Sequence, residues 1–476
     1  MAIKGKTTFE LTDVNTGEVE IIEDNNMVTN ALQEFMLTYG VFNKGIFIND
    51  NMTNALCLNL LGGLFLFDTA LDEDVDNTFM PAGVKMVGNG SNYANNSGVT
   101  ELGSYNIPES GIQSDGSIKF VYDYATNQAN GTIACACLTS RVGGYMGMGN
   151  SAKRFSSDNQ INAHQSSTSL YLALPGAGNY YFNILYPVYN ENAIYCTNPY
   201  NTVYTSTESR QHWSVTKKIE ILRVRAGFTS VGIKDNQNLN KVIDSFEVDI
   251  PQAILDYMGT STATIIPVGD SFNRNIFLIF NKSTNTIASG AYCWIMKIDK
   301  DKNVTAHKFT NNVNENLSLR TFTESRKQYT INGDYLWVAS SSGKLYGIKY
   351  SDSTQIIDTG ADTNSSYPHI CSIAENLIGI GGVSQGGSYP FPAYSIYDVV
   401  NRTYRYVNGR EYNNAYMYIP FADKKGVYLR VYTDDSYCRM EVVKDVRYLA
   451  TINNLSEPVV KTSSKTMKVT YTITEV

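Results

Sequence analysis

The spacing of apolar residues constrains the fold of this chain most. It is helical only near the N-terminus and is typical of strands in the rest of the chain. From Met27 to Tyr39 apolar side chains recur every three or four residues, and Gly40 follows, which predicts a helix. A second, shorter helix is predicted from Asn51 to Leu61. After Phe67 the helical spacing disappears, and strands separated by Gly, Asn and Ser clusters follow. We therefore expect a mainly β protein with one or two helices.

The composition agrees with strands that have large interaction surfaces. Charged residues make up only 17% of the 476 residues, below the roughly 25% of ordinary globular proteins. Polarity is carried by Asn, Ser, Thr and Gly instead. Tyrosine occurs 34 times, and this side chain suits half-buried strands and wet interfaces better than it suits helices.

The charge balance and the apolar runs exclude two classes of partner. The formal net charge of -7 leaves no basic stripe, so we expect no nucleic-acid binding. No run approaches the roughly 18 apolar residues of a membrane helix, so we expect no membrane insertion. The segment Met1–Phe9 lacks the layout of a secretory signal, which predicts a protein made in the cytoplasm.

The cysteines and histidines show no framework of disulfides or metal ligands. Seven cysteines, an odd number, are scattered without a repeating spacing. Cys135 and Cys137 would share one face of a strand, where a metal half-site is conceivable but buried free thiols are favoured. None of the four histidines has zinc-site spacing: His164, His212, His307 and His369.

A length of about 150 residues per domain is usual, so the 476 residues predict two to four domains. Residues 1–235 are predicted to form an N-terminal β-sandwich-like domain for attachment to a particle. It opens with a hairpin of Thr7–Val14 and Glu18–Ile22, and a long strand from Trp213 to Val224 would close it.

Residues 240–450 are predicted to form an irregular β-propeller-like domain. Four apolar strand pairs follow one another there, and the last three begin at a spacing close to the roughly 40 to 50 residues of propeller blades. An irregular sandwich remains an alternative, because no WD or kelch signature accompanies the spacing. Residues 451–476 end in a cleanly alternating strand, Thr466–Glu475, that we expect to return to the N-terminal domain.

Gly269-Asp-Ser271 is the best candidate for a catalytic motif. It follows an apolar strand, like the nucleophile turn of SGNH-type esterases, in which an Asp-x-x-His activates the serine. The residues three before His307 and His369 are Val304 and Ser366, so that partner is missing. A turn between propeller strands is the favoured interpretation.

Other candidate sites are also weak. Asp72–Asn77 offers carboxylates at calcium-loop spacing but lacks the diagnostic Gly and Glu, so a solvated acidic loop is favoured. Gly147-Met-Gly149 has no helix start after it and indicates a turn rather than a phosphate loop. Aromatic clusters at Tyr180–Phe182 and Tyr389–Tyr394 could stack on sugars, although packing explains them first. We expect no catalytic residue, no cofactor and no metal site.

Two stretches resemble virion proteins of phages that infect Firmicutes-type bacteria. Gly116–Ala134 is similar to a strand, Asp-aromatic corner, Asn-Gly turn and strand of tail and tail-fibre proteins. Leu449–Thr474 resembles the C-terminal ending of such proteins. The resemblance implies an all-β particle component.

The expected function is therefore that of a non-enzymatic structural protein of a phage or phage-like tail, as a tail fibre, baseplate or receptor-binding component. Its expected partners are other tail proteins and a host cell-surface glycan or protein, within a homo-oligomer or a symmetric assembly. Its expected location is the virion, after assembly in the host cytoplasm. The alternative is a tail-associated hydrolase or esterase of envelope glycans, because paired carboxylates cannot be recognised from sequence spacing.

Overall fold

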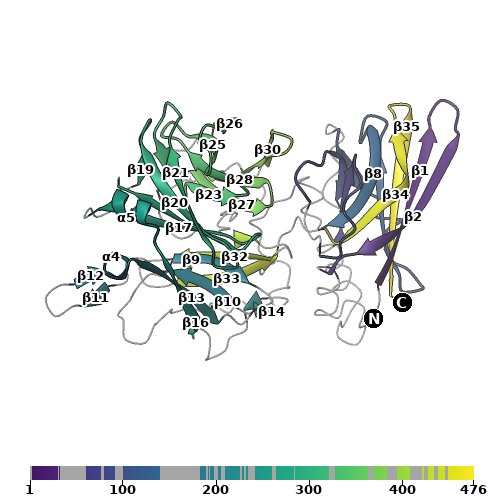
Figure 1. Cartoon of the computed structure of the whole chain (residues 1–476). Helices are drawn as coiled ribbons and strands as arrows, with labels where there is room; N and C mark the ends of the chain where they lie inside the picture. Colours follow the sequence, from purple (N-terminus) through teal and green to yellow (C-terminus); the bar gives the residue numbers. More distant parts are fainter. Residues whose placement is uncertain are drawn as a thin grey trace, which may run out of the picture. The chain divides into compact units, whose positions relative to one another are not determined.

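A computed structural model of the chain divides into two compact units. Unit 1 comprises residues 1–163, 424–426 and 444–476, and unit 2 comprises residues 164–423 and 427–443 (Figure 1). The structure describes residues 3–30, 32, 61–76, 80–91, 100–139, 183–188, 191, 193–197, 202–204, 209–225, 228–229, 232–233, 242–259, 264–282, 285–320, 327–362, 368–382, 394–407, 421–422, 427–433, 438–444 and 449–475.

Unit 1 is a closed, barrel-like sheet built from both ends of the chain. Nine strands pair in the order β35-β1-β2-β34-β8-β3-β4-β5-β7, and β7 pairs with β35 to close the ring, while β6 is added to β7. The strands are β1 (Ile3–Asp13), β2 (Val19–Val28), β3 (Gly63–Phe67), β4 (Met86–Ser91), β5 (Leu102–Tyr105), β6 (Gly111–Ile112), β7 (Ile118–Tyr124), β8 (Gly131–Thr139), β34 (Thr451–Lys461) and β35 (Lys465–Glu475).

The expectation of an N-terminal β-sandwich is wrong, because closure joins the edges that a sandwich would leave open. β34 lies between β2 and β8, and β35 lies between β1 and β7, so two C-terminal strands enter the sheet where one was expected. All eleven residues of β1 pair with β35, from Ile3 opposite Glu475 to Asp13 opposite Lys465. Closing the sheet removes the unpaired strand edges that favour aggregation.

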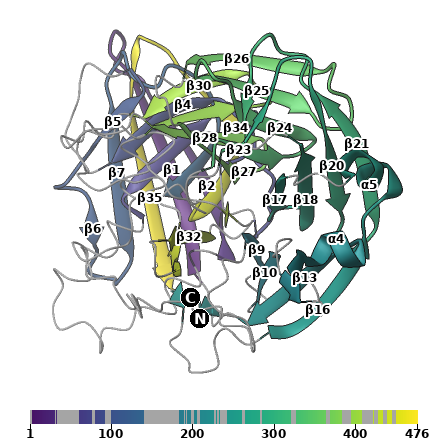
Figure 2. The ribbon, with the colours of Figure 1, turned by 90° about the vertical axis from the view of Figure 1, so that its left-hand side faces the viewer.

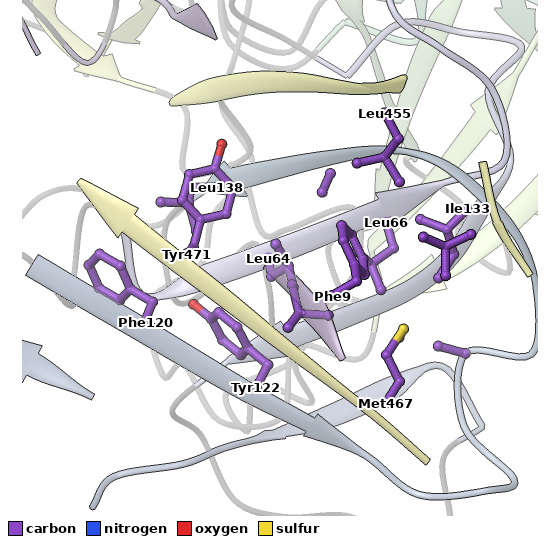
Figure 3. Close-up of a cluster of buried hydrophobic side chains, with 14 of the residues drawn as sticks. Phe9, Leu64, Leu66, Phe120, Tyr122, Ile133, Leu138, Leu455, Met467 and Tyr471 are labelled. Atoms are coloured by element: carbon purple, nitrogen blue, oxygen red, sulfur yellow. The ribbon is translucent and has the colours of Figure 1, made fainter. Parts of the chain in front are cut away.

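The inside of the barrel is filled with apolar and tyrosine side chains from alternate positions of its strands. Figure 3 shows Phe9, Tyr122 and Tyr471 among them, and all three are buried. The Tyr471 hydroxyl donates to the Thr451 hydroxyl over 2.5 Å. Gly103 leaves room for another core tyrosine, because a Cβ at this position would lie 2.5 Å from a ring carbon of Tyr124.

Unit 2 contains five consecutive antiparallel sheets, four of four strands and one of three, among the residues described. In Figure 2 these sheets follow one another along an arc. They are β9 (Asn183–Val188), β10 (Ala193–Thr197), β13 (Lys218–Arg225) and β16 (Val242–Asp249); β17 (Thr264–Asp270), β18 (Asn275–Asn281), β20 (Tyr292–Ile298) and β21 (Val304–Thr310); β23 (Tyr329–Asn332), β24 (Tyr335–Ala339), β25 (Lys344–Lys349) and β26 (Ile356–Asp362); β27 (Pro368–Ala374), β28 (Leu377–Gly382), β29 (Tyr394–Asp398) and β30 (Thr403–Val407); and β31 (Phe421–Ala422), β32 (Val427–Thr433) and β33 (Cys438–Lys444).

This arrangement confirms the propeller-like region. The first strands of successive sheets, β9, β17, β23, β27 and β31, are neighbours in space, as expected of blades placed side by side. In the part of unit 2 that the structure describes, three two-stranded sheets accompany the blades: β11 (Thr202–Tyr204) with β12 (Ser209–Gln211), β14 (Phe228–Thr229) with β15 (Gly232–Ile233), and β19 (Thr286–Ile287) with β22 (Leu317–Ser318).

The expected domain boundary near residue 235 is wrong, because the first blade already begins at β9. The strand expected to close the N-terminal domain, Trp213–Val224, forms a short helix followed by β13, and β13 pairs with β10 and β16. This sheet shares a buried core with the next blade, where Ile221 and Leu278 belong to one cluster. Unit 2 therefore includes residues 183–249.

The described residues of unit 2 include two short helices, α4 (His212–Thr216) and α5 (Gln252–Met258). The helix expected at Met27–Tyr39 begins too early, since Met27 and Val28 end β2. Most of that stretch, and residues 51–60 of the second expected helix, lie outside the described residues. None of the helices described has the length and apolar character needed to cross a membrane.

Candidate functional site

Gly269 and Asp270 end β17, and Ser271 begins the tight turn to β18. Asp270 is buried, and its carboxylate accepts hydrogen bonds from the backbone N–H groups of Phe272 and Asn273, at 3.0 and 3.2 Å. The Asn273 side chain donates to the second carboxylate oxygen over 2.9 Å. Burial raises the pKa of Asp270, although these hydrogen bonds oppose the rise. The carboxylate thus holds the turn together.

The same turn recurs in the fourth blade, which explains the motif without catalysis. Asp270-Ser-Phe-Asn-Arg274 and Asp398-Val-Val-Asn-Arg402 share an Asp-x-x-Asn-Arg pattern. Asp398 likewise accepts from the backbone N–H groups of Val400 and Asn401, both at 2.9 Å. Both arginines adopt positive φ, 56° and 53°. This repeat is visible in the sequence, and it is the signal from which the turn could have been identified.

An ion-pair network lies beside the Asp270 turn. Arg274 contacts Glu191 over 2.9 Å, and Glu191 also contacts Arg223 over 3.6 Å. Arg223 in turn forms a two-point contact with Asp244, at 3.0 and 2.6 Å. The Tyr195 hydroxyl donates to Glu191 over 3.3 Å. Each of these charges has a partner, which is typical of a network that joins β10, β13 and β16 to the turn rather than of a reacting group.

The histidine nearest in sequence to the Asp270 turn is not arranged as a catalytic base. His307 lies in β21, where its ring is 5.5 Å from the ring of Tyr350. Partial burial lowers the pKa of His307, which favours the neutral imidazole. His164 lies outside the described residues, as do the side chains of His212 and His369.

The remaining sequence candidates do not gather into a site. Asp74 accepts from the backbone N–H of Asp76, whose own carboxylate accepts from the Asn30 side chain over 2.9 Å. The Sγ atoms of Cys135 and Cys137 lie 3.6 Å apart and are buried, and burial raises the pKa of Cys137. Searched over the described ranges, no three His, Cys, Asp or Glu side chains could together hold a metal ion. The expected turn at Gly147–Gly149 and the aromatic clusters at 180–182 and 389–393 lie outside the described residues.

A surface group on the second blade was not expected from the sequence. We call Tyr257, Lys282, Tyr292 and Lys308 the lysine–tyrosine patch. The Lys282 ammonium lies 4.8 Å from the ring centre of Tyr257, and that of Lys308 lies 4.2 Å from the ring centre of Tyr292. The two rings lie 5.1 Å apart. Tyr257 comes from α5, and Lys282 directly follows β18. Tyr292 and Lys308 belong to β20 and β21, so no sequence motif unites the four residues.

Comparison with known proteins gives only distant structural likenesses. No protein-family model and no curated protein matches the sequence. The structures that resemble the chain include the Pan2 WD40 domain of Neurospora crassa, which is 10% identical, with 59% of this chain and 91% of that chain covered and a TM-score of 0.23. Apo AztD of Citrobacter koseri is 11% identical, with 72% of this chain and 93% of that chain covered and a TM-score of 0.25. YCF48 bound to D1 peptide is 7% identical, with 58% of this chain and 94% of that chain covered and a TM-score of 0.22. Scores this low carry no functional argument.

Proposed function

We propose that this chain is a non-enzymatic structural protein of a phage or phage-like tail that contributes to attachment to the host surface. The resemblance of Gly116–Ala134 and Leu449–Thr474 to tail proteins supports the virion assignment. Both stretches belong to the barrel, where they supply β7, β8, β34 and β35. The barrel is therefore proposed as the part that docks to other tail proteins.

The insertion of unit 2 into the barrel is the observation that carries this proposal. The chain leaves the barrel after β8 and returns to it at β34, so both ends of the inserted propeller-like region are tied to one closed sheet. The strands that close the barrel and the inserted region can therefore serve separate roles. We propose that unit 2 contacts the host envelope, and that the protein works in a homo-oligomer or a symmetric assembly within the virion.

The rival function, an envelope glycan hydrolase or esterase, has no specific observation in its favour. Its best motif is a structural turn that recurs elsewhere in the chain, and the ion pairs beside that turn are mutually satisfied. The propeller surface instead offers exposed aromatic and cationic side chains, which suit binding.

Labelling of whole cells tests the proposal. The purified full-length chain, carrying a fluorophore, is incubated at micromolar concentration with susceptible bacteria and with a resistant strain lacking the receptor. We expect labelling of the susceptible cells only, without release of soluble sugar from purified envelopes. Equal labelling of both strains, or no labelling at all, would contradict host attachment, and released sugar would favour the hydrolase.

A further inference from the structure

We infer that the lysine–tyrosine patch binds an anionic glycan, a polymer of sugar or polyol units that carries phosphate or carboxylate groups. This inference rests on the proposed attachment function and gives it a site and a ligand class. The patch lies on the second blade, where α5 packs beside β18 and β20. It combines two cationic groups with an exposed aromatic ring, and these are the two features that such a polymer requires.

The two tyrosines form a fixed base for the patch. The Tyr257 hydroxyl donates to the backbone oxygen of Tyr292 over 3.0 Å and accepts from the backbone N–H of Lys282 over 3.3 Å. One hydroxyl thereby links α5 to β20 and to the residue that follows β18. Tyr257 is nearly buried, whereas Tyr292 is 41% exposed, so the second ring is available for contact with a ligand. A fixed aromatic ring loses little conformational freedom on binding.

The two lysines lack any carboxylate partner in the part of the chain that the structure describes. Several other lysines form ion pairs, such as Lys6 with Glu23 and Lys468 with Glu109, at 2.8 and 2.9 Å. Lys282 and Lys308 instead lie against tyrosine rings, and neither ammonium donates a hydrogen bond to any residue within the described ranges. An ammonium group has three N–H donors, so each lysine keeps donors for an outside acceptor.

The surroundings of the patch favour an anion. Asp256 neighbours Tyr257 in α5, but its carboxylate accepts from the Gln252 side chain over 2.7 Å and forms no ion pair with the patch. Lysine binds phosphate and other anions as a point charge without demanding planar geometry. Sugar and polyol rings or chains pack on aromatic side chains. A neutral glycan would offer the ammonium groups only uncharged oxygen acceptors, and hydrogen bonds to ionised acceptors are the stronger ones.

Direct binding to defined polymers tests the inference. The full-length chain is titrated with a glycerol-phosphate polymer, with polygalacturonate, with neutral dextran and with inorganic polyphosphate. We expect binding to at least one of the first two, and the pair identifies whether phosphate or carboxylate is recognised. The double variant Lys282→Gln with Lys308→Gln should lose affinity by about tenfold or more, because charge-assisted hydrogen bonds to the anion are removed.

Two further variants separate charge from specific recognition. Lys85→Gln with Lys300→Gln removes the same charge from exposed positions outside the patch and should bind like the wild type. Tyr292→Leu should weaken binding of the glycan but not of polyphosphate. The inference is overturned if neither anionic glycan binds, if the two double variants behave alike, or if polyphosphate binds as tightly as the glycans.

The outcomes also separate this inference from the proposed attachment function. If the wild type and Lys282→Gln with Lys308→Gln label susceptible cells equally, attachment stands and the assignment of the patch fails. If glycan binding depends on the patch but no cells are labelled, the patch stands and host attachment fails.

Discussion

Replacing Asp270 by alanine should destabilise unit 2 without affecting any chemistry. The change removes the acceptor for two backbone N–H groups and for the Asn273 side chain. A partly buried donor left without a partner costs about 1–3 kcal/mol, and the side-chain amide can turn towards solvent. We therefore expect a loss of about 2–4 kcal/mol in the free energy of unfolding. Asp398→Ala removes the corresponding acceptor and should cost a similar amount.

Asp270→Asn is the matched control for this experiment. It retains one side-chain oxygen for the backbone N–H groups and removes a carboxylate whose raised pKa shows that burial disfavours its charge. Its expected loss is about 1 kcal/mol or less. The assay is urea unfolding followed by tyrosine and tryptophan fluorescence at neutral pH. A variant Asp270→Ala that unfolds at the wild-type urea concentration, or a wild-type ester hydrolysis that this variant abolishes, would refute the turn interpretation.

Three further predictions follow from buried contacts. Gly269→Ala should destabilise unit 2 by about 3 kcal/mol or more in urea unfolding, because the Cβ of the alanine would lie 1.8 Å from the Leu185 backbone oxygen. A variant with wild-type stability would contradict this prediction. Lys461→Met should lower the free energy of unfolding of the barrel by about 2–4 kcal/mol in calorimetry, because the ammonium donates to three oxygens of residues 125–130. The control Lys465→Met removes a surface ion pair and should change this free energy by less than about 1 kcal/mol. Hydrogen bonds from serine hydroxyls lower the pKa of Glu315 from 4.5 to about 2. The stability that this carboxylate contributes is therefore present above pH 4.5 and is lost as the pH falls towards 2. Glu315→Gln should remove this acid-dependent loss of about 1–2 kcal/mol, and a variant with the wild-type pH profile of stability would contradict the prediction.

Local patterns in the sequence predicted the hairpin and the later blades. The alternation in Thr7–Val14 and the turn after it correspond to β1 and β2, and the strand pairs beyond residue 264 correspond to successive blades. These features depend on neighbours close in sequence. The closure of the barrel does not, because Thr7 pairs with Tyr471 at the other end of the chain.

The strands that the sequence did not reveal have weak or interrupted alternation. In β34, Asn, Ser, Glu and Pro residues break the pattern between Asn454 and Val459, where the pairing register with β8 shifts. The first blade was assigned to the wrong domain because its strands are separated by segments of unequal length. The shared packing of Ile221 and Leu278 and the contact between β9 and β17 show that it belongs with the next blade.

At the candidate site too, only the features that depend on residues close in sequence were predictable. The Asp-x-x-Asn-Arg turn could be recognised from its second occurrence at Asp398, because the repeat is local. The lysine–tyrosine patch could not, since Tyr257 and Lys308 lie 51 positions apart and meet only after α5 packs on the blade.

The central claim is that the chain is part of a tail, and locating it on particles tests this most directly. Phage particles from the source bacterium are labelled with a gold-tagged antibody against this chain and viewed by negative-stain electron microscopy. We predict gold on the tail, at its tip or fibres if the protein attaches to the host. Particles that stay unlabelled, although the antibody recognises the purified chain, would contradict the account.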